Sequence, residues 1–281
     1  MGVSGELGPR TRAFFGAALA AGLWLAGAVT LHAQFVSEER VQAAIDDASR
    51  GLGQALAGGS PLTGPAATTG GLGHFQIGVA GSLTRIEIED PSREEGTLEF
   101  LAPVGSLQGA VGILDGGPLG FGAVDLLGRV GPVVAREDFD EGATLYAVGA
   151  RVGILGGSAT MPAVSATVSR SWVDGLEWGD PEGDEVSFTG GVSTTSLRLD
   201  VSKGFLLVTP YAGVGVDRTA IEADYRIPTA LGATKGSTDA SSVHQKAYAG
   251  IDLALLLARA TVEVGVYDGG VFGAVGVRVG L

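Results

Sequence analysis

The sequence predicts an all-β protein: a single antiparallel, up-and-down transmembrane β-barrel of about ten strands, with a range of eight to twelve. Bulky apolar residues alternate with small or polar residues along most of the chain, which is the period of a β-strand. Long polar connections alternate with short turns. The chain is 45% hydrophobic, yet after the N-terminal leader no window has the ~18 uncharged apolar residues that a membrane helix needs. Glycine, at 48 of 281 residues, also favours strands and turns over long helices.

The first expected element is a signal peptide over residues 1–33, cleaved near Ala33. Arg10 and Arg12 give it a positive start, and residues 13–29 form an uncharged apolar core. An uncleaved membrane anchor is the alternative, because this core is close to the shortest that spans about 30 Å of hydrocarbon. An exported apolar chain without membrane helices can satisfy its backbone hydrogen bonds in lipid only as a closed barrel. We therefore expect a bacterial outer-membrane location.

Residues 34–71 are expected to form a helical arm followed by a Gly/Pro linker. Within residues 35–59, apolar side chains fall on one helical face: Val41, Ile45, Ala48, Leu52 and Leu56. Gly51 and Gly53 weaken the second half of this helix. Two placements stay open, a plug in the barrel mouth or a periplasmic arm, and the arm is the commoner arrangement.

The barrel itself is expected to occupy residues 72–281. Ten segments alternate in the way described: 73–90, 97–114, 119–135, 142–155, 162–174, 186–202, 205–227, 243–257, 259–267 and 270–281. Several exceed the ~9–11 residues that cross a bilayer on a tilt, whereas soluble strands are usually nearer 5–6. An even number of strands returns the C-terminus to the side where the barrel begins.

The connections form two classes, which we assign to opposite ends of the barrel. Four of the outward connections are charged or long and polar: residues 90–96, 136–142, 175–185 and 228–242. The fifth, residues 268–270, is short. The opposite end has tight turns: residues 115–118, 156–161, 202–204 and 258–259. This alternation is typical of outer-membrane barrels, which have short periplasmic turns and longer extracellular loops.

The last six residues, 276–281, place alternating apolar residues after a glycine. They resemble the C-terminal signal that the barrel-assembly machinery reads in bacterial outer-membrane β-barrel proteins. The order of leader, short amphipathic helix, Gly/Pro linker and barrel is similar to an uncharacterised family of outer-membrane barrels. The resemblance implies the fold, the location and handling by periplasmic chaperones and the assembly machinery during biogenesis. It implies no activity.

If the bulky face of each strand points to lipid, the small and polar face lines the interior. Charged residues on that interior face are nearly balanced in sign: Asp125, Arg129, Arg151, Arg198, Asp200, Lys246, Asp252, Glu263 and Arg278. Charges that faced lipid near the midplane would cost about 2–4 kcal/mol each, so their common phase supports the interior assignment. Two interpretations stay open: a polar path with local charge selectivity, or a salt-bridged filling of a narrow lumen.

The sequence predicts neither an enzyme nor a cofactor site. The mature chain keeps His74 and His244, which we expect to be surface residues near the two ends of the barrel. No acidic cluster accompanies His244 in sequence, so a His–Asp pair that activates water has little support. Two acidic loops could bind Ca²⁺ or Mg²⁺, but solvated surface is the expectation, with no metal site: Asp138, Asp140, Glu141, Asp180, Glu182, Asp184 and Glu185.

The expected function is therefore a narrow or gated, porin-like channel for small polar solutes, with outer-membrane lipid as its surroundings. A net charge of −13 argues against nucleic acid as a partner. One alternative is a closed barrel with a structural or surface-interaction role and no transport. Another is a soluble secreted β-sandwich, in which valines and leucines would pack in a central core and Asp125, Arg151 and Glu263 would face solvent.

Overall fold

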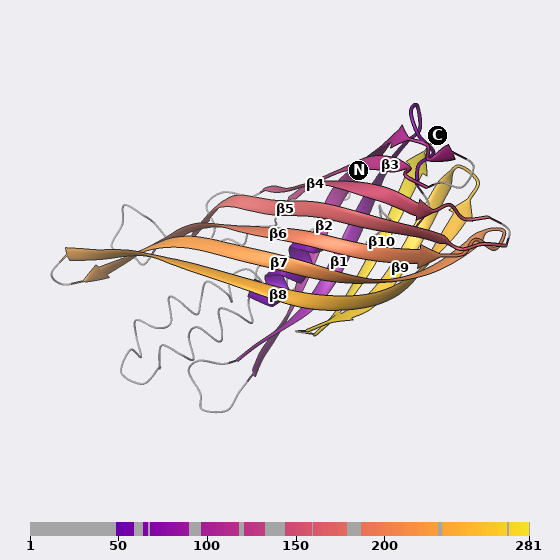
Figure 1. The fold of residues 1–281 in the computed structure, drawn as a ribbon. Coiled ribbons are helices and arrows are strands. Elements are labelled where there is room, and N and C mark those ends of the chain that lie inside the picture. Colours follow the sequence, from indigo (N-terminus) through magenta and orange to yellow (C-terminus); the bar gives the residue numbers. More distant parts are fainter. Residues whose placement is uncertain are drawn as a thin grey trace, which may run out of the picture.

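A computed structural model describes residues 49–58, 64–66, 68–89, 97–117, 121–132, 144–158, 160–178, 187–229, 232–268 and 270–280. Its strands are β1 (Phe75–Glu89), β2 (Thr97–Leu114), β3 (Val124–Pro132), β4 (Thr144–Leu155), β5 (Ala163–Trp178), β6 (Ser187–Ser202), β7 (Val208–Thr229), β8 (Gly232–Leu255), β9 (Ala258–Tyr267) and β10 (Gly270–Gly280). Each strand pairs with its neighbours along the chain, and β1 pairs with β10 to close the barrel (Figure 1). The predicted single antiparallel barrel of about ten strands is confirmed, and the soluble β-sandwich is wrong.

The alternation along each strand places apolar side chains outside and polar ones inside. On β9, Val262, Val264 and Val266 are 53%, 63% and 56% exposed. Between them, Thr261 and Glu263 are each only 1% exposed. A water-soluble barrel would show the opposite arrangement, because burial of apolar surface drives folding in water. The interior of this barrel is instead built from polar and charged side chains.

The apolar outer surface forms a band around one part of the barrel. Strand β7 shows its limit: Val208, Val214 and Val216 are exposed, and the next exposed positions on the same face include Arg218 and Glu222. We call the end of the barrel beyond these charges the loop end. The other end, which holds the short connections from β2 to β3, β4 to β5, β6 to β7 and β8 to β9, is the turn end. At the loop end, β7 and β8 form a long hairpin that projects to the left in Figure 1.

The prediction of a long loop over residues 228–242 is wrong, because most of this segment belongs to a β-hairpin. Strands β7 and β8 stay paired up to Thr229 and Gly232. Polar and small residues occupy both faces of the hairpin over residues 228–242, so the alternation that identifies a strand disappears. Residues 175–178 likewise belong to β5. The predicted signal peptide and the predicted acidic loop residues lie outside the described residues.

Two predicted turns are displaced, and leucine is the reason. The structure places the β6–β7 connection at residues 203–207 and the β8–β9 turn at residues 256–257, not at 202–204 and 258–259. Leu206 and Leu256 occupy the left-handed region, with φ of 53° and 42°. Such a conformation costs a non-glycine residue about 1–2 kcal/mol, so a sequence reading looks for glycine there. Both leucines are fully exposed at the turn end. No helix in the described part of the chain is long and apolar enough to span a membrane.

Candidate functional site in the barrel interior

A helix formed by residues 49–57 lies inside the barrel. At Ser49, the first described residue of this helix, the hydroxyl oxygen lies 2.7 Å from that of Ser242. Near its end, Leu56 packs in a buried apolar cluster with Leu145, Val173 and Val192. These wall residues belong to β8, β4, β5 and β6, so strands from much of the circumference contact the helix. We call residues 49–58 the plug.

Gly51 and Gly53 let the plug approach the wall closely. A Cβ on Gly51 would lie 2.4 Å from Cγ2 of Ile86, and one on Gly53 would lie 1.9 Å from Oγ1 of Thr219. Glycine in a helix costs about 1 kcal/mol relative to alanine. At these two positions glycine allows the helix to contact Ile86 and Thr219 directly. Any larger residue would push the helix away from β1 or β7.

The end of the plug is held by Arg129. Its guanidinium donates to the carbonyl oxygens of Leu56 and Ala57, at 2.9 and 3.1 Å. The last carbonyls of a helix have no partner within the helix, and a cation is favourable at that end of the helix dipole. Gly58 follows in the left-handed conformation, with φ of 65°, as is common just after a helix. Arg129 therefore anchors the plug to strand β3.

The linker after the plug is also attached to the interior wall. The amide N–H of Ala66 donates to the Ser202 hydroxyl at 3.0 Å. The N–H and hydroxyl of Thr69 both donate to the Asp125 carboxylate, with a hydroxyl-to-oxygen distance of 2.6 Å. Of the two placements left open by the sequence, the favoured periplasmic arm is wrong for residues 49–58, which lie in the lumen. Residues 34–48 lie outside the described part of the chain.

The structure places all nine of the charged residues singled out in the sequence on the interior side. Arg129 is partly buried, and the other eight are at most 5% exposed: Asp125, Arg151, Arg198, Asp200, Lys246, Asp252, Glu263 and Arg278. Most of them form ion pairs, several of them across strands. Arg151 binds Asp125 at 2.6 Å, and Asp252 binds both Arg259 and Arg278. Pairing offsets the large cost of taking these charges out of water.

Arg198 forms the centre of one interior network. Its guanidinium lies 3.2 Å from the Glu263 carboxylate and donates to the Tyr248 hydroxyl at 2.8 Å. Tyr248 in turn donates to Asp200 at 2.6 Å. Tyr211 donates to Glu263 at 2.9 Å. Every charged group in this network therefore has a partner, which ties strands β6, β7, β8 and β9 together.

Interior glycines make room for the aromatic rings of this network. Gly213 is the cross-strand partner of Tyr248, and Gly250 is the partner of Tyr211. A Cβ on Gly213 would lie 2.3 Å from the Tyr248 hydroxyl oxygen, and one on Gly250 would lie 2.4 Å from the Tyr211 ring. A glycine inside a strand often marks such a close approach. Part of the glycine excess is thus explained by rings that lie flat against the inner wall.

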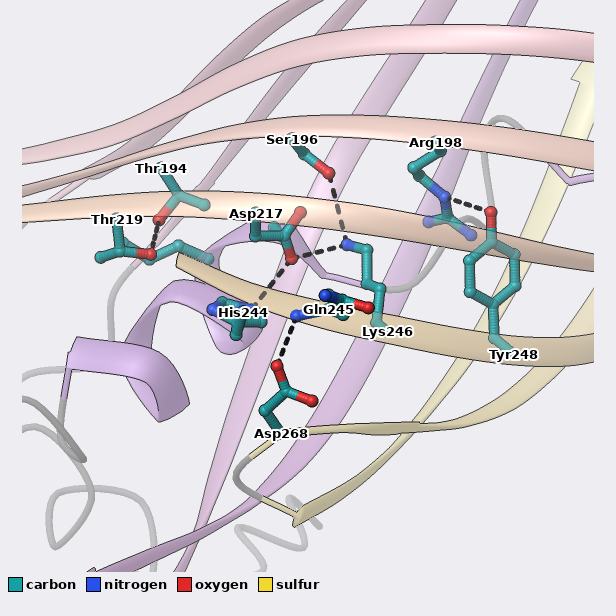
Figure 2. Close-up of polar contacts among 12 residues, drawn as sticks. Thr194, Ser196, Arg198, Asp217, Thr219, His244, Gln245, Lys246, Tyr248 and Asp268 are labelled. Atoms are coloured by element: carbon teal, nitrogen blue, oxygen red, sulfur yellow. Dashed lines mark hydrogen bonds and ion pairs between the residues drawn. The ribbon is translucent and has the colours of Figure 1, made fainter. Parts of the chain in front are cut away.

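A second network, shown in Figure 2, joins Asp217, His244 and Lys246. One oxygen of Asp217 lies 3.1 Å from Nε2 of His244 and 2.8 Å from Nζ of Lys246. Lys246 also donates to the Ser196 hydroxyl at 3.3 Å. The prediction that His244 is a surface residue is wrong, because it is fully buried. Asp217 was not singled out, although it has the same strand phase as the other interior residues and is the register partner of His244.

The other candidates from the sequence add no site. His74 is exposed next to the start of β1, as expected of a surface residue. Within the described residues, no three side chains of His, Asp or Glu gather as a metal site would require. The interior does hold unsatisfied polar atoms beside the plug. Gln54 is fully buried, and neither atom of its side-chain amide has a partner among the protein groups.

Comparison with known proteins yields weak structural similarities. No family model matches the chain, and no curated protein matches it. The crystal structure of Ail, the attachment invasion locus protein of Yersinia pestis, in complex with the heparin analogue sucrose octasulfate, is similar over 75% of this chain and 99% of that chain, with 11% identity and a TM-score of 0.35. The TodX deltaS2S3 mutant, a monoaromatic hydrocarbon channel, is similar over 79% of this chain and 70% of that chain, with 12% identity and a TM-score of 0.38.

Proposed function

We propose that this protein is an outer-membrane β-barrel in which the plug gates a narrow path for small polar solutes. The observation that carries the proposal is the position of residues 49–58, which lie in a polar lumen and are held there by Arg129 and Ser242. The turn end would face the periplasm and the loop end the exterior. Two parts of the proposal, the membrane and the gate, can be tested separately.

The membrane assignment is supported by the apolar band. Bulky side chains more than 40% exposed occur on every strand, including Val79 on β1, Leu199 on β6 and Val275 on β10. A soluble monomer rarely exposes a contiguous apolar patch larger than a few hundred Å², and this one encircles the barrel. Closure of the sheet also leaves no unpaired strand edge within the band, which hydrocarbon requires.

Val264→Arg tests the membrane assignment. We expect the variant to lower the free energy of unfolding from lipid vesicles by about 2–4 kcal/mol, because Val264 lies within the outer band and its arginine would face hydrocarbon. Ser241→Arg is the matched control, since Ser241 is also exposed on the outside but lies beyond the band at the loop end. Urea titrations of the refolded barrels give both values. Equal stabilities of the two variants would contradict a lipid-facing band.

The gating role of the plug is supported by the small space that remains beside it in the lumen. Beside the end of the helix, a cavity of about 60 Å³ is lined by Ala57, Arg129, Arg198 and several hydroxyl groups. A cavity of this size holds only a few water molecules, which fits a lumen that is narrow beside the plug. Unsatisfied buried groups such as the Gln54 amide cost about 1–3 kcal/mol each, which favours a plug that can leave over one that is permanently packed.

Gly53→Ala tests the gate. The added Cβ would favour the helix by about 1 kcal/mol, but it would overlap the Thr219 hydroxyl, and overpacking costs about 1–3 kcal/mol. We therefore expect openings in planar bilayers to become about tenfold more frequent than in the unmodified protein. Gly105→Ala is the control, because nothing lies within 4 Å of a Cβ at that position. Silence of all three proteins would instead favour a closed structural barrel, which the dense interior ion pairs also suit.

A further inference from the structure

The turn end of the lumen contains a second, larger cavity of about 500 Å³. Its walls come from the linker after the plug, the β4–β5 and β6–β7 connections, and the turn-end parts of strands around the barrel, including β4, β9 and β10. Three arginines line it, Arg151, Arg259 and Arg278, and no acidic residue is among its described lining residues. The chain as a whole has a net charge of −13, so three guanidinium groups in one cavity are a marked local reversal of sign.

The carboxylates that pair with these arginines are fully buried behind the cavity wall. Arg151 pairs with Asp125, while Arg259 and Arg278 share the single carboxylate of Asp252. Among the described residues, the ion pairs of these three arginines involve two carboxylates, those of Asp125 and Asp252. The Arg259 side chain is 41% exposed, so its charge is accessible from the cavity. Lys203 donates to the carbonyl oxygen of Ser158, which is one of the lining residues.

The remaining lining suits an anion as well. Hydroxyl and amide groups that can donate hydrogen bonds surround the arginines: Thr68, Gln76, Ser158, Ser202 and Thr209. A guanidinium binds the oxygens of phosphate or carboxylate through parallel hydrogen bonds. We propose that this cavity binds a small oxyanion, with a phosphate group as the best match. The proposal deepens the function proposed above, on which it rests, by naming the class of solute that the gate admits.

The cavity is also connected to the plug through the linker. Asp125 accepts hydrogen bonds from Thr69 of the linker and from Arg151 of the cavity wall. The Arg278 guanidinium packs against Gly64, where a Cβ would lie only 2.9 Å away. An oxyanion that binds Arg151 or Arg278 thus acts on the same groups that hold the linker. Binding at the turn end therefore has a direct route to the segment that closes the lumen.

Calorimetric titration of inorganic phosphate tests the site. The full chain is refolded in a neutral detergent, and ionic strength is held constant with chloride. We expect saturable binding to one site, and at least about tenfold weaker binding to Arg259→Gln, because one charge-assisted hydrogen-bonding group is lost. Arg218→Gln removes an exposed arginine from the outer surface of β7 and should leave binding unchanged. The proposal is overturned if phosphate does not bind saturably, or if both variants bind alike.

A second arm identifies the source of the phosphate group. The same titration is repeated in nanodiscs of zwitterionic lipid, with and without phosphatidylglycerol. Weaker apparent phosphate binding with phosphatidylglycerol, lost in Arg259→Gln, identifies a lipid headgroup in the same site, whereas unchanged binding identifies a free anion. Phosphate binding does not require the plug to move, so a barrel that binds phosphate but never conducts contradicts the gate alone. A barrel that conducts without binding phosphate contradicts the oxyanion site alone.

Discussion

The double variant S49C/S242C, once oxidised, is expected to hold the barrel closed. The two hydroxyl oxygens are 2.7 Å apart, a separation that a disulfide bond of about 2.05 Å with an ordinary Cβ spacing can bridge. The chain contains no cysteine, so the introduced pair has no competing thiol. In the Gly53→Ala background, oxidation should reduce bilayer openings at least about a hundredfold, and a reductant should restore them. The reason is covalent: the plug can no longer leave β8.

A second disulfide serves as the control. It distinguishes closure caused by a locked plug from closure caused by a stiffened barrel wall. Thr194 and Thr219 lie on neighbouring strands β6 and β7, with hydroxyl oxygens 3.1 Å apart, and Thr219 is the residue that Gly53 contacts. T194C/T219C in the same background should therefore conduct equally in its oxidised and reduced forms. Closure by both disulfides would mean that the wall rather than the plug moves. Continued conduction by oxidised S49C/S242C would show that the path bypasses the plug.

The barrel could be predicted from the sequence because the alternation that identifies each strand is a pattern among neighbouring residues. Residues 97–114 and 259–267 alternate clearly, and they correspond closely to β2 (Thr97–Leu114) and β9 (Ala258–Tyr267). Alternation also fixes which side chains share a face, since successive residues of a strand point to opposite sides. That phase alone was sufficient to assign nine charges to the interior.

The site could not be predicted to the same degree, because its contacts depend on register and on distant segments. Arg198 and Glu263 are 65 residues apart, and only the shear of the closed barrel brings them to one level. His244 was misread for the same reason, since Asp217 lies 27 residues away and meets it only across the β7–β8 ladder. The plug position rests on Gly51 and Gly53, which local helix propensity counts as defects.

Glu263→Gln is expected to be strongly destabilising, although it leaves side-chain volume nearly unchanged. The variant leaves the Arg198 guanidinium buried, with Asp200 as its remaining acidic neighbour at 3.9 Å. Removal of one partner of a buried ion pair costs about 3–5 kcal/mol, since the other charge stays uncompensated. Urea unfolding of the refolded barrel in vesicles measures this loss. Replacement of both residues, in R198M/E263L, should recover part of it, because Arg198 is no longer left as a buried charge, while Asp200 keeps the hydrogen bond from Tyr248.

The surface ion pair between Arg85 and Glu99 provides the matched control. Its atoms are 2.7 Å apart, but both side chains are about half exposed, so Glu99→Gln should change the free energy of unfolding far less. The comparison also bears on the lumen itself. If Glu263→Gln were as mild as Glu99→Gln, the surroundings of Arg198 would have to be hydrated, because only water screens a lone charge so well. A hydrated centre would argue for a permanently open path past the plug, and the gate would then have no role.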